Sequence, residues 1–140
     1  MHPMIPILRY CALVLSVVIA PVVTVAESYV VDSLEFPKDM PPEIGAIDFA
    51  PDGMLYISLR RGDVMVAQPS KDPKGFRWKR FATGFHNGCG MHIVKPGHVI
   101  VSQMAELTEV IDTDGDGVAD EYNKLETGIG LSGNYHETNA

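Results

Sequence analysis

A pattern of short strands and turns that recurs after 44 residues constrains the fold of this chain more than any other feature. In its first occurrence, residues 46–50 (AIDFA) and 54–59 (MLYISL) alternate as half-buried strands do, and Pro51-Asp52-Gly53 between them favours a tight turn. A third strand is predicted at residues 64–68. An exposed outer strand is predicted at residues 76–83 (FRWKRFAT).

A shift of the sequence by 44 residues aligns apolar positions of this first unit with apolar positions of a second unit, without a gap. The aligned pairs are Ile47 and Met91, Phe49 and Ile93, Leu55 and Val99, Ile57 and Val101, and Val66 and Val110. Tandem β-rich units of about 40–50 residues are typical of β-propeller blades. A chance match between two β-hairpins is the alternative explanation. The 13 glycines and 10 prolines fit an all-β fold with many turns.

The repeat predicts blade-like units at residues 44–87 and 88–131, with a third unit beginning near residue 134. A single blade cannot bury both of its faces, and a propeller closes with about four to eight blades. We therefore expect an incomplete β-propeller domain over residues 27–140 that holds about two blades. Such a chain is a fragment, the product of a truncated reading frame, or a piece that completes itself with other chains.

The first 26 residues have the pattern of a secretory signal peptide. Arg9 provides the positive charge, residues 11–20 (CALVLSVVIA) form an apolar stretch, and Thr24-Val25-Ala26 offers a small-residue cleavage site. A membrane anchor is the alternative, but the apolar stretch of residues 11–26 is shorter than the roughly 20 residues that span a bilayer. We therefore expect a secreted or periplasmic protein with no membrane span after cleavage.

Cysteine count and charge exclude several classes of protein. Cleavage after Ala26 leaves Cys89 as the sole cysteine, so the mature chain has neither an intrachain disulfide nor a Cys-x-x-Cys-His haem site. The formal net charge is −7, and residues 106–140 carry nine acidic side chains and one basic side chain, Lys124. An acidic end argues against nucleic-acid binding. It fits a cation site or a solvated face.

An aspartate-rich loop at residues 112–121 (DTDGDGVADE) is the sharpest local motif. Aspartates at its positions 1, 3 and 5 and a glycine at position 6 match the first half of a calcium-binding loop, in which carboxylates converge on a hard cation. Position 12 is an asparagine rather than the glutamate of an EF-hand, and the flanking segments are predicted to be strands. The candidate oxygen ligands are Asp112, Asp114, Asp116, Val118 (through its carbonyl), Asp120 and Asn123. A solvated turn is the alternative to a structural calcium site.

Three segments resemble one protein family: residues 104–108 (MAELT), 112–122 (DTDGDGVADEY) and 131–137 (LSGNYHE). They are similar to the propeller domain of large secreted bacterial proteins, common in planctomycetes, that are described as membrane-bound or sorbosone-type dehydrogenases. These proteins are similar in turn to the soluble quinoprotein glucose and sorbosone dehydrogenases. The resemblance implies part of a six-bladed propeller that uses pyrroloquinoline quinone (PQQ) and calcium.

The resemblance also implies candidate catalytic and cofactor-binding histidines. His136 matches the position of the general base that takes the substrate hydroxyl proton while hydride passes to the quinone. His92 lies one repeat earlier and is a candidate cofactor-binding residue. A strand histidine that serves packing or hydrogen bonding is the alternative for both.

Two functions follow from these observations. The first is a fragment of an exported PQQ-dependent sugar or alcohol dehydrogenase, an oxidoreductase acting on CH–OH groups that is inactive without the remaining blades. The second is a non-catalytic, exported, calcium-stabilised propeller module that binds a glycan or a protein partner.

Overall fold

The computed structural model describes residues 29–104 and 106–129. The chain divides into two units, residues 1–31 and 32–140, and all the strands discussed below belong to the second. The predicted signal peptide at residues 1–26 and His136 both lie outside the described residues. Within the described part, no helix has the length and apolar character needed to cross a bilayer.

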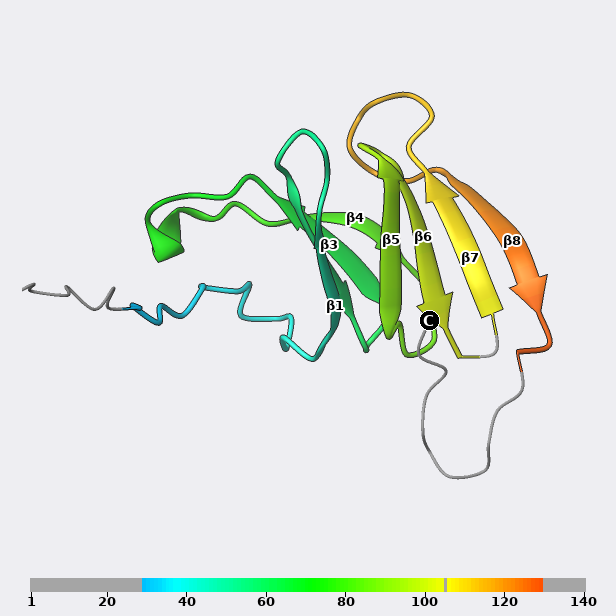
Figure 1. Ribbon diagram of the computed structural model, residues 1–140, viewed down its shortest axis with the longest axis horizontal. Helices are drawn as coiled ribbons and strands as arrows, with labels where there is room; N and C mark the ends of the chain where they lie inside the picture. Colours follow the sequence, from blue (N-terminus) through cyan, green and yellow to red (C-terminus); the bar gives the residue numbers. More distant parts are fainter. Residues whose placement is uncertain (1–28, 105, 130–140) are drawn as a thin grey trace, which may run out of the picture. The chain divides into compact units, whose positions relative to one another are not determined.

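The first sheet is an antiparallel meander of four strands in the order β1-β2-β3-β4 (Figure 1). Its strands are β1 (Ile44–Phe49), β2 (Leu55–Leu59), β3 (Asp63–Ala67) and β4 (Lys79–Thr83). The turn between β1 and β2 forms where the Pro-Asp-Gly sequence predicts it, since the Gly53 amide donates to the Ala50 carbonyl at 2.8 Å. Gly53 has a φ of +85°, which glycine adopts at low cost.

The second sheet repeats this plan in the order β5-β6-β7-β8. Its strands are β5 (Gly90–Lys95), β6 (His98–Gln103), β7 (Glu106–Ile111) and β8 (Glu121–Thr127). Together with one short 3-10 turn, η1 (Pro73–Gly75), these strands make up the regular structure of the described residues. The prediction of an all-β chain is confirmed.

The outer strand of the first sheet is shorter than the sequence predicts. It begins at Lys79 rather than at residue 76, because the η1 turn and Pro73 hold the preceding chain away from the sheet edge. Phe76 and Trp78 instead stack on one another, with ring centroids 5.7 Å apart, and the Trp78 indole donates to the Glu35 carbonyl at 2.9 Å. These rings therefore pack over one face of the first sheet instead of alternating along a strand.

The 44-residue repeat holds in the first two strands of each sheet and fails in the third. Ile47 pairs with Ile57 as Met91 pairs with Val101. Ile57 then pairs with Met65, whereas Val101 pairs with Thr108, which lies only 43 residues after Met65. The gap-free match of Val66 with Val110 is therefore wrong, because the β6–β7 hairpin is one residue shorter than the β2–β3 hairpin.

An irregularity in the strand pairing recurs in both sheets and restores the 44-residue spacing. Met65 pairs with Arg80, and Thr108 pairs with Lys124. In each case the next residue of the outer strand, Phe81 or Leu125, is left without a Cα partner. A bulge at equivalent positions is a structural sign of a repeated unit that hydrophobic patterning does not reveal.

The main core lies between the two sheets. It joins Tyr56, Val64, Val66, Phe81 and Ala82 of the first sheet to Ile93, Val99, Val101 and Val110 of the second. A second cluster lies on the other face of the first sheet and contains Met40, Leu55, Ile57, Leu59 and Met65, with Phe36, Phe76 and Trp78 packed against it. The first sheet is thus apolar on both faces.

The backbone at the start of β1 lies close to the backbone just before β5, and this contact requires glycine. A Cβ atom at Gly45 would lie 1.9 Å from the Gly88 carbonyl oxygen, and a Cβ atom at Gly88 would lie 2.6 Å from the Ser58 hydroxyl. Real Cβ atoms do not approach a backbone oxygen so closely. The first strands of the two sheets, β1 and β5, also contact one another.

We predict that Phe81→Ala lowers the free energy of unfolding by about 3–5 kcal/mol, because the ring is buried between the two sheets and its removal leaves a cavity. Chemical denaturation followed by circular dichroism measures the loss. Val118→Ala is the control, since that side chain is 39% exposed and its truncation should have a much smaller effect. Equal losses in the two variants would contradict the placement of the core.

Candidate metal centre

The aspartate loop connects β7 to β8 and is held by backbone hydrogen bonds to three places. The Asp120 amide donates to the Ile111 carbonyl at 3.0 Å, which closes the base of the loop. The Asp112 amide donates to the carbonyl of Gly97, in the β5–β6 turn, at 2.8 Å. The Ala119 amide donates to the Phe81 carbonyl on β4 of the first sheet at 2.7 Å. The loop therefore bridges the two sheets.

Three aspartates converge within the loop. Asp112, Asp114 and Asp116 each offer a carboxylate oxygen, and these oxygens lie within 4.8 Å of one another. Asp112 accepts from the amides of Gly115 at 2.7 Å and Gly117 at 2.8 Å. Both glycines have positive φ values, 78° and 82°, which let the backbone curl around the Asp112 carboxylate.

Backbone amides also orient the other two carboxylates. Asp114 accepts from the Asp116 amide at 3.1 Å, and Asp116 accepts from the Val118 amide at 2.7 Å. Each carboxylate is thus fixed by the residues that follow it, as in a preformed oxygen site. Asp112 is partly buried, while Asp114 and Asp116 are exposed and open to a cation from solvent.

The pKa of Asp112 is lowered from its ordinary value. Partial burial acts in the opposite direction and raises it, but the amides of Gly117, Gly115 and Asp116 together outweigh that effect. The carboxylate is therefore charged over the whole neutral and weakly acidic range, the state in which it can bind a metal ion.

The other predicted ligands, Asp120, Asn123 and Val118, have different surroundings from those of the three clustered aspartates. Asp120 accepts from the Thr113 amide at 3.1 Å and from the Thr113 hydroxyl at 2.8 and 2.9 Å, so it braces the start of the loop. The Asn123 amide donates to Glu109 at 3.2 Å and to Glu121 at 2.7 Å, along the second sheet. The Val118 carbonyl follows the three aspartates directly in the chain.

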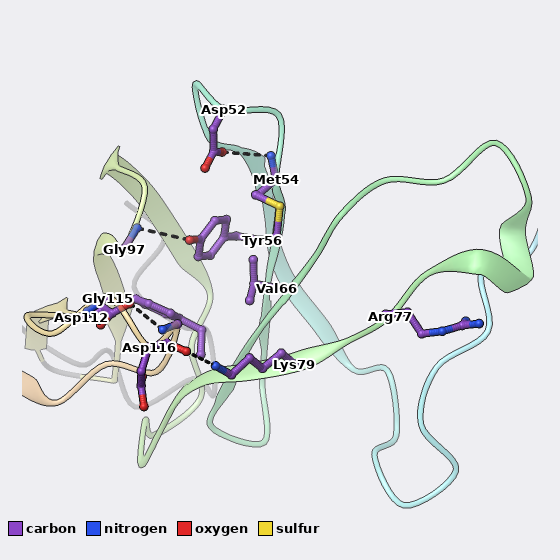
Figure 2. Close-up of a pocket in the computed structure, with 12 residues that line it drawn as sticks. Asp52, Met54, Tyr56, Val66, Arg77, Lys79, Gly97, Asp112, Gly115 and Asp116 are labelled. Carbon is purple, nitrogen blue, oxygen red and sulfur yellow. Dashed lines mark hydrogen bonds between the residues drawn. The ribbon is translucent and has the colours of Figure 1, made fainter.

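A hollow of about 430 Å³ adjoins the aspartate loop (Figure 2). Lys79 reaches from β4, and its ammonium donates to the Asp116 carbonyl. The Tyr56 hydroxyl accepts from the Gly97 amide at 3.3 Å. Burial raises the pKa of Tyr56, and the nearby charges of Asp52 and Asp112 add to the effect, while the Gly97 amide opposes it.

Sequence reasoning does not identify Lys79 or Tyr56 as neighbours of the loop. They precede it by tens of residues and belong to the other sheet, so no local motif contains them. The 44-residue repeat gives only a partial signal. It predicts two consecutive sheets in the chain, but not which side chains of one sheet reach the other. Only the packing of the sheets brings these side chains to the aspartates.

His92 lies on β5, exposed and away from the aspartate loop. It pairs with Ile100 and lines a small hollow of about 110 Å³ together with Gly90, Met91, Ser102 and Leu107. No lysine or arginine lines this hollow, so His92 alone would face the several carboxylates of PQQ. The described residues around His92 therefore do not fit that cofactor.

A second histidine, His98, forms a half-buried pair on the same sheet. Its Nε2 atom lies 2.6 Å from Glu109 Oε1. The hydrogen bond with His98 lowers the pKa of Glu109, and the bond from Asn123 adds to the effect. No linear motif contains this pair, because its members come from the adjacent strands β6 and β7.

Comparisons with protein-family models, curated proteins and solved structures found no match. The likeness to quinoprotein dehydrogenases stays a prediction made from the sequence. The geometry of the aspartate loop is what indicates a cation site.

We predict that Asp112→Asn flattens the dependence of stability on pH in acid. Because the folded-state pKa is depressed, the stability that Asp112 contributes is present above its unfolded value of 3.8 and is lost as the pH falls through the folded value. Melting temperatures measured with a chelator present should therefore differ between wild type and variant at neutral pH and converge in acid. Parallel curves would contradict the role given to these amide donors.

Proposed function

We propose that this chain is part of an exported β-propeller of the quinoprotein-dehydrogenase-like type, in which the described residues form two consecutive blades. In this proposal the loop at residues 112–120 holds a structural calcium ion that fastens the two blades together. The function of the described region is thus to provide a calcium-stabilised propeller scaffold. Export would place it in a compartment where calcium is plentiful.

The direction in which equivalent faces of the two sheets point supports a propeller arrangement. Ile57 and Val101 are equivalent, yet Val101 lies in the core between the sheets and Ile57 lies on the opposite face of the first sheet. Each sheet therefore presents the same face in the same direction around the stack. A β-sandwich whose two like faces meet would bury both residues in one core, whereas successive blades of a propeller repeat by rotation.

The convergence of three carboxylates carries the calcium proposal. Calcium takes about six to eight oxygen ligands at 2.3–2.6 Å, and two carboxylate oxygens bound to one ion lie within about 5 Å of each other. The Asp112, Asp114 and Asp116 oxygens meet that condition. The Val118 carbonyl and solvent water would complete the shell. Three negative charges so close together repel one another, and a divalent cation removes that repulsion.

A calcium ion in this loop would stabilise the contact between the sheets. The loop touches β4 through the Ala119 amide and through Lys79, and it touches the β5–β6 turn through Gly97, which in turn binds Tyr56 of β2. An ordered loop keeps all of these contacts in place. The free energy of calcium binding is therefore coupled to the association of the two blades.

Dehydrogenase activity stays a prediction from the resemblance. The histidine it assigns as general base, His136, lies outside the described residues, and the surroundings of His92 do not fit PQQ. In this proposal, the activity would require blades beyond the two formed by the described residues.

We predict that calcium binds with a stoichiometry of one and raises the melting temperature, and that Asp114→Asn combined with Asp116→Asn weakens binding at least tenfold. Isothermal titration calorimetry measures the affinity and differential scanning fluorimetry measures the shift. Asp52→Asn is the control, because Asp52 lines the adjacent hollow but is not one of the three clustered aspartates. Binding that is unchanged in the double variant would overturn the calcium proposal.

We also predict that Lys79→Met has opposite effects on stability and on calcium affinity. Loss of the hydrogen bond to Asp116 lowers the calcium-free stability by about 0.5–1.5 kcal/mol. Loss of a positive charge beside the aspartates raises calcium affinity, by about two- to tenfold at low salt. The affinity gain should shrink in high salt. A loss of both stability and affinity would show that Lys79 only shapes the loop.

A further inference from the structure

The first sheet has an open apolar face. Ile44, Ile47 and Phe49 of β1 are 44%, 56% and 60% exposed. With Leu55 and Ile57 of β2 they line a hollow of about 480 Å³. The other residues around it are also largely apolar: Ser33, Leu34, Phe36 and Pro42. Large apolar side chains gathered in this way mark an interaction surface.

The equivalent face of the second sheet is covered, and its cover indicates what the open face could bind. Met91 and Ile93 on β5 are the equivalents of Ile47 and Phe49, and both pack into the core between the sheets. Ile93 is 7% exposed, against 60% for Phe49. The cover over Ile93 is the opposite face of the first sheet, with Tyr56 and Phe81. The equivalent position is therefore covered by a four-stranded sheet.

The outer face of the second sheet corresponds to that covering surface. The pairing of the strands makes Ile100 the equivalent of Tyr56, Leu107 the equivalent of Val64, and the unpaired Leu125 the equivalent of Phe81. Ile100 and Leu107 are half-buried and Leu125 is exposed. The carboxylate of Glu109, on the same face, is already paired with His98.

From this correspondence we propose that the open face of the first sheet binds the outer face of the second sheet of another copy of this chain. This inference rests on the blade arrangement proposed above, because it continues the contact between the sheets from one copy into the next. The interface joins two different surfaces, so copies associate head to tail and either close into a ring or grow into a filament.

Part of the open face is already covered by the chain itself, and this limits the proposed contact to the remaining part. Phe36, Phe76 and Trp78 already pack over the cluster that contains Leu59 and Met65. The side chains left exposed belong to β1. The docked sheet therefore lies over β1 and β2, the strands whose equivalents β5 and β6 supply most of the second sheet's share of the core.

The test is sedimentation velocity of the purified chain from micromolar to submillimolar concentration. We expect the wild type to form species of two or more copies. Phe49→Asp and Leu107→Asp should each be monomeric, the first because its open face is blocked and the second because its outer face is blocked. Leu125→Asp is a second outer-face variant at an exposed position, and circular dichroism confirms that each variant folds. Lys71→Asp, a change at an exposed residue between β3 and η1 that does not line the open hollow, should associate like the wild type.

The decisive experiment mixes the two monomeric variants. Phe49→Asp keeps an intact outer face and Leu107→Asp keeps an intact open face, so an equimolar mixture should form a dimer that cannot grow further. A wild type that stays monomeric, or a Leu107→Asp variant that still dimerises through like faces, would overturn the proposal. Calcium titration of the same samples separates the outcomes, because a monomer that binds calcium contradicts only the association between copies.

Discussion

The burial of Phe81 between the two sheets is the contact on which the rest of the structure depends. Its ring is 1% exposed and meets Tyr56 edge to face, with centroids 5.4 Å apart. Its carbonyl accepts from Ala119 in the aspartate loop. Phe81 reaches this position because the outer strand bulges there, which turns the ring towards the second sheet. One irregular residue thus joins the hydrophobic core to the candidate metal centre.

Polar groups at the edges of this core are satisfied, which allows the sheets to pack closely. Among the described residues, no buried side-chain nitrogen or oxygen lacks a hydrogen-bond partner. Thr108 donates to Glu106 at 2.5 Å and accepts from Gln103 at 2.7 Å. The bond from Thr108 lowers the pKa of Glu106, and Lys124 adds to the effect. A buried polar group without a partner would weaken the contact between the sheets, so these short networks are part of its stability.

The sequence predicts the strands better than it predicts their register. Alternation and the Pro-Asp-Gly turn locate the first two strands of the first sheet, because side-chain period and turn chemistry are local properties, and the 44-residue shift locates their equivalents in the second. The third strand is misaligned since Val66 and Val110 are alike in sequence but belong to hairpins of different length. The three aspartates form a linear motif and converge as predicted. Lys79 belongs to no such motif, because only sheet packing brings it to the loop. Asn123, where the sequence departs from the EF-hand pattern, donates to Glu109 from β8.

The two sheets differ in how completely they are covered, and this difference follows from their place in the stack. All five residues of β2 are buried, although Leu55 and Ile57 still line the hollow beside the exposed side chains of β1. Strand β8 is almost wholly exposed. Between these limits, β6 alternates towards the core and away from it. A sheet that is apolar on both faces is stable only within a stack of at least three layers. In this chain the segment around Phe36 and Met40 supplies part of the third layer, and the uncovered side chains of β1 show where that layer is incomplete.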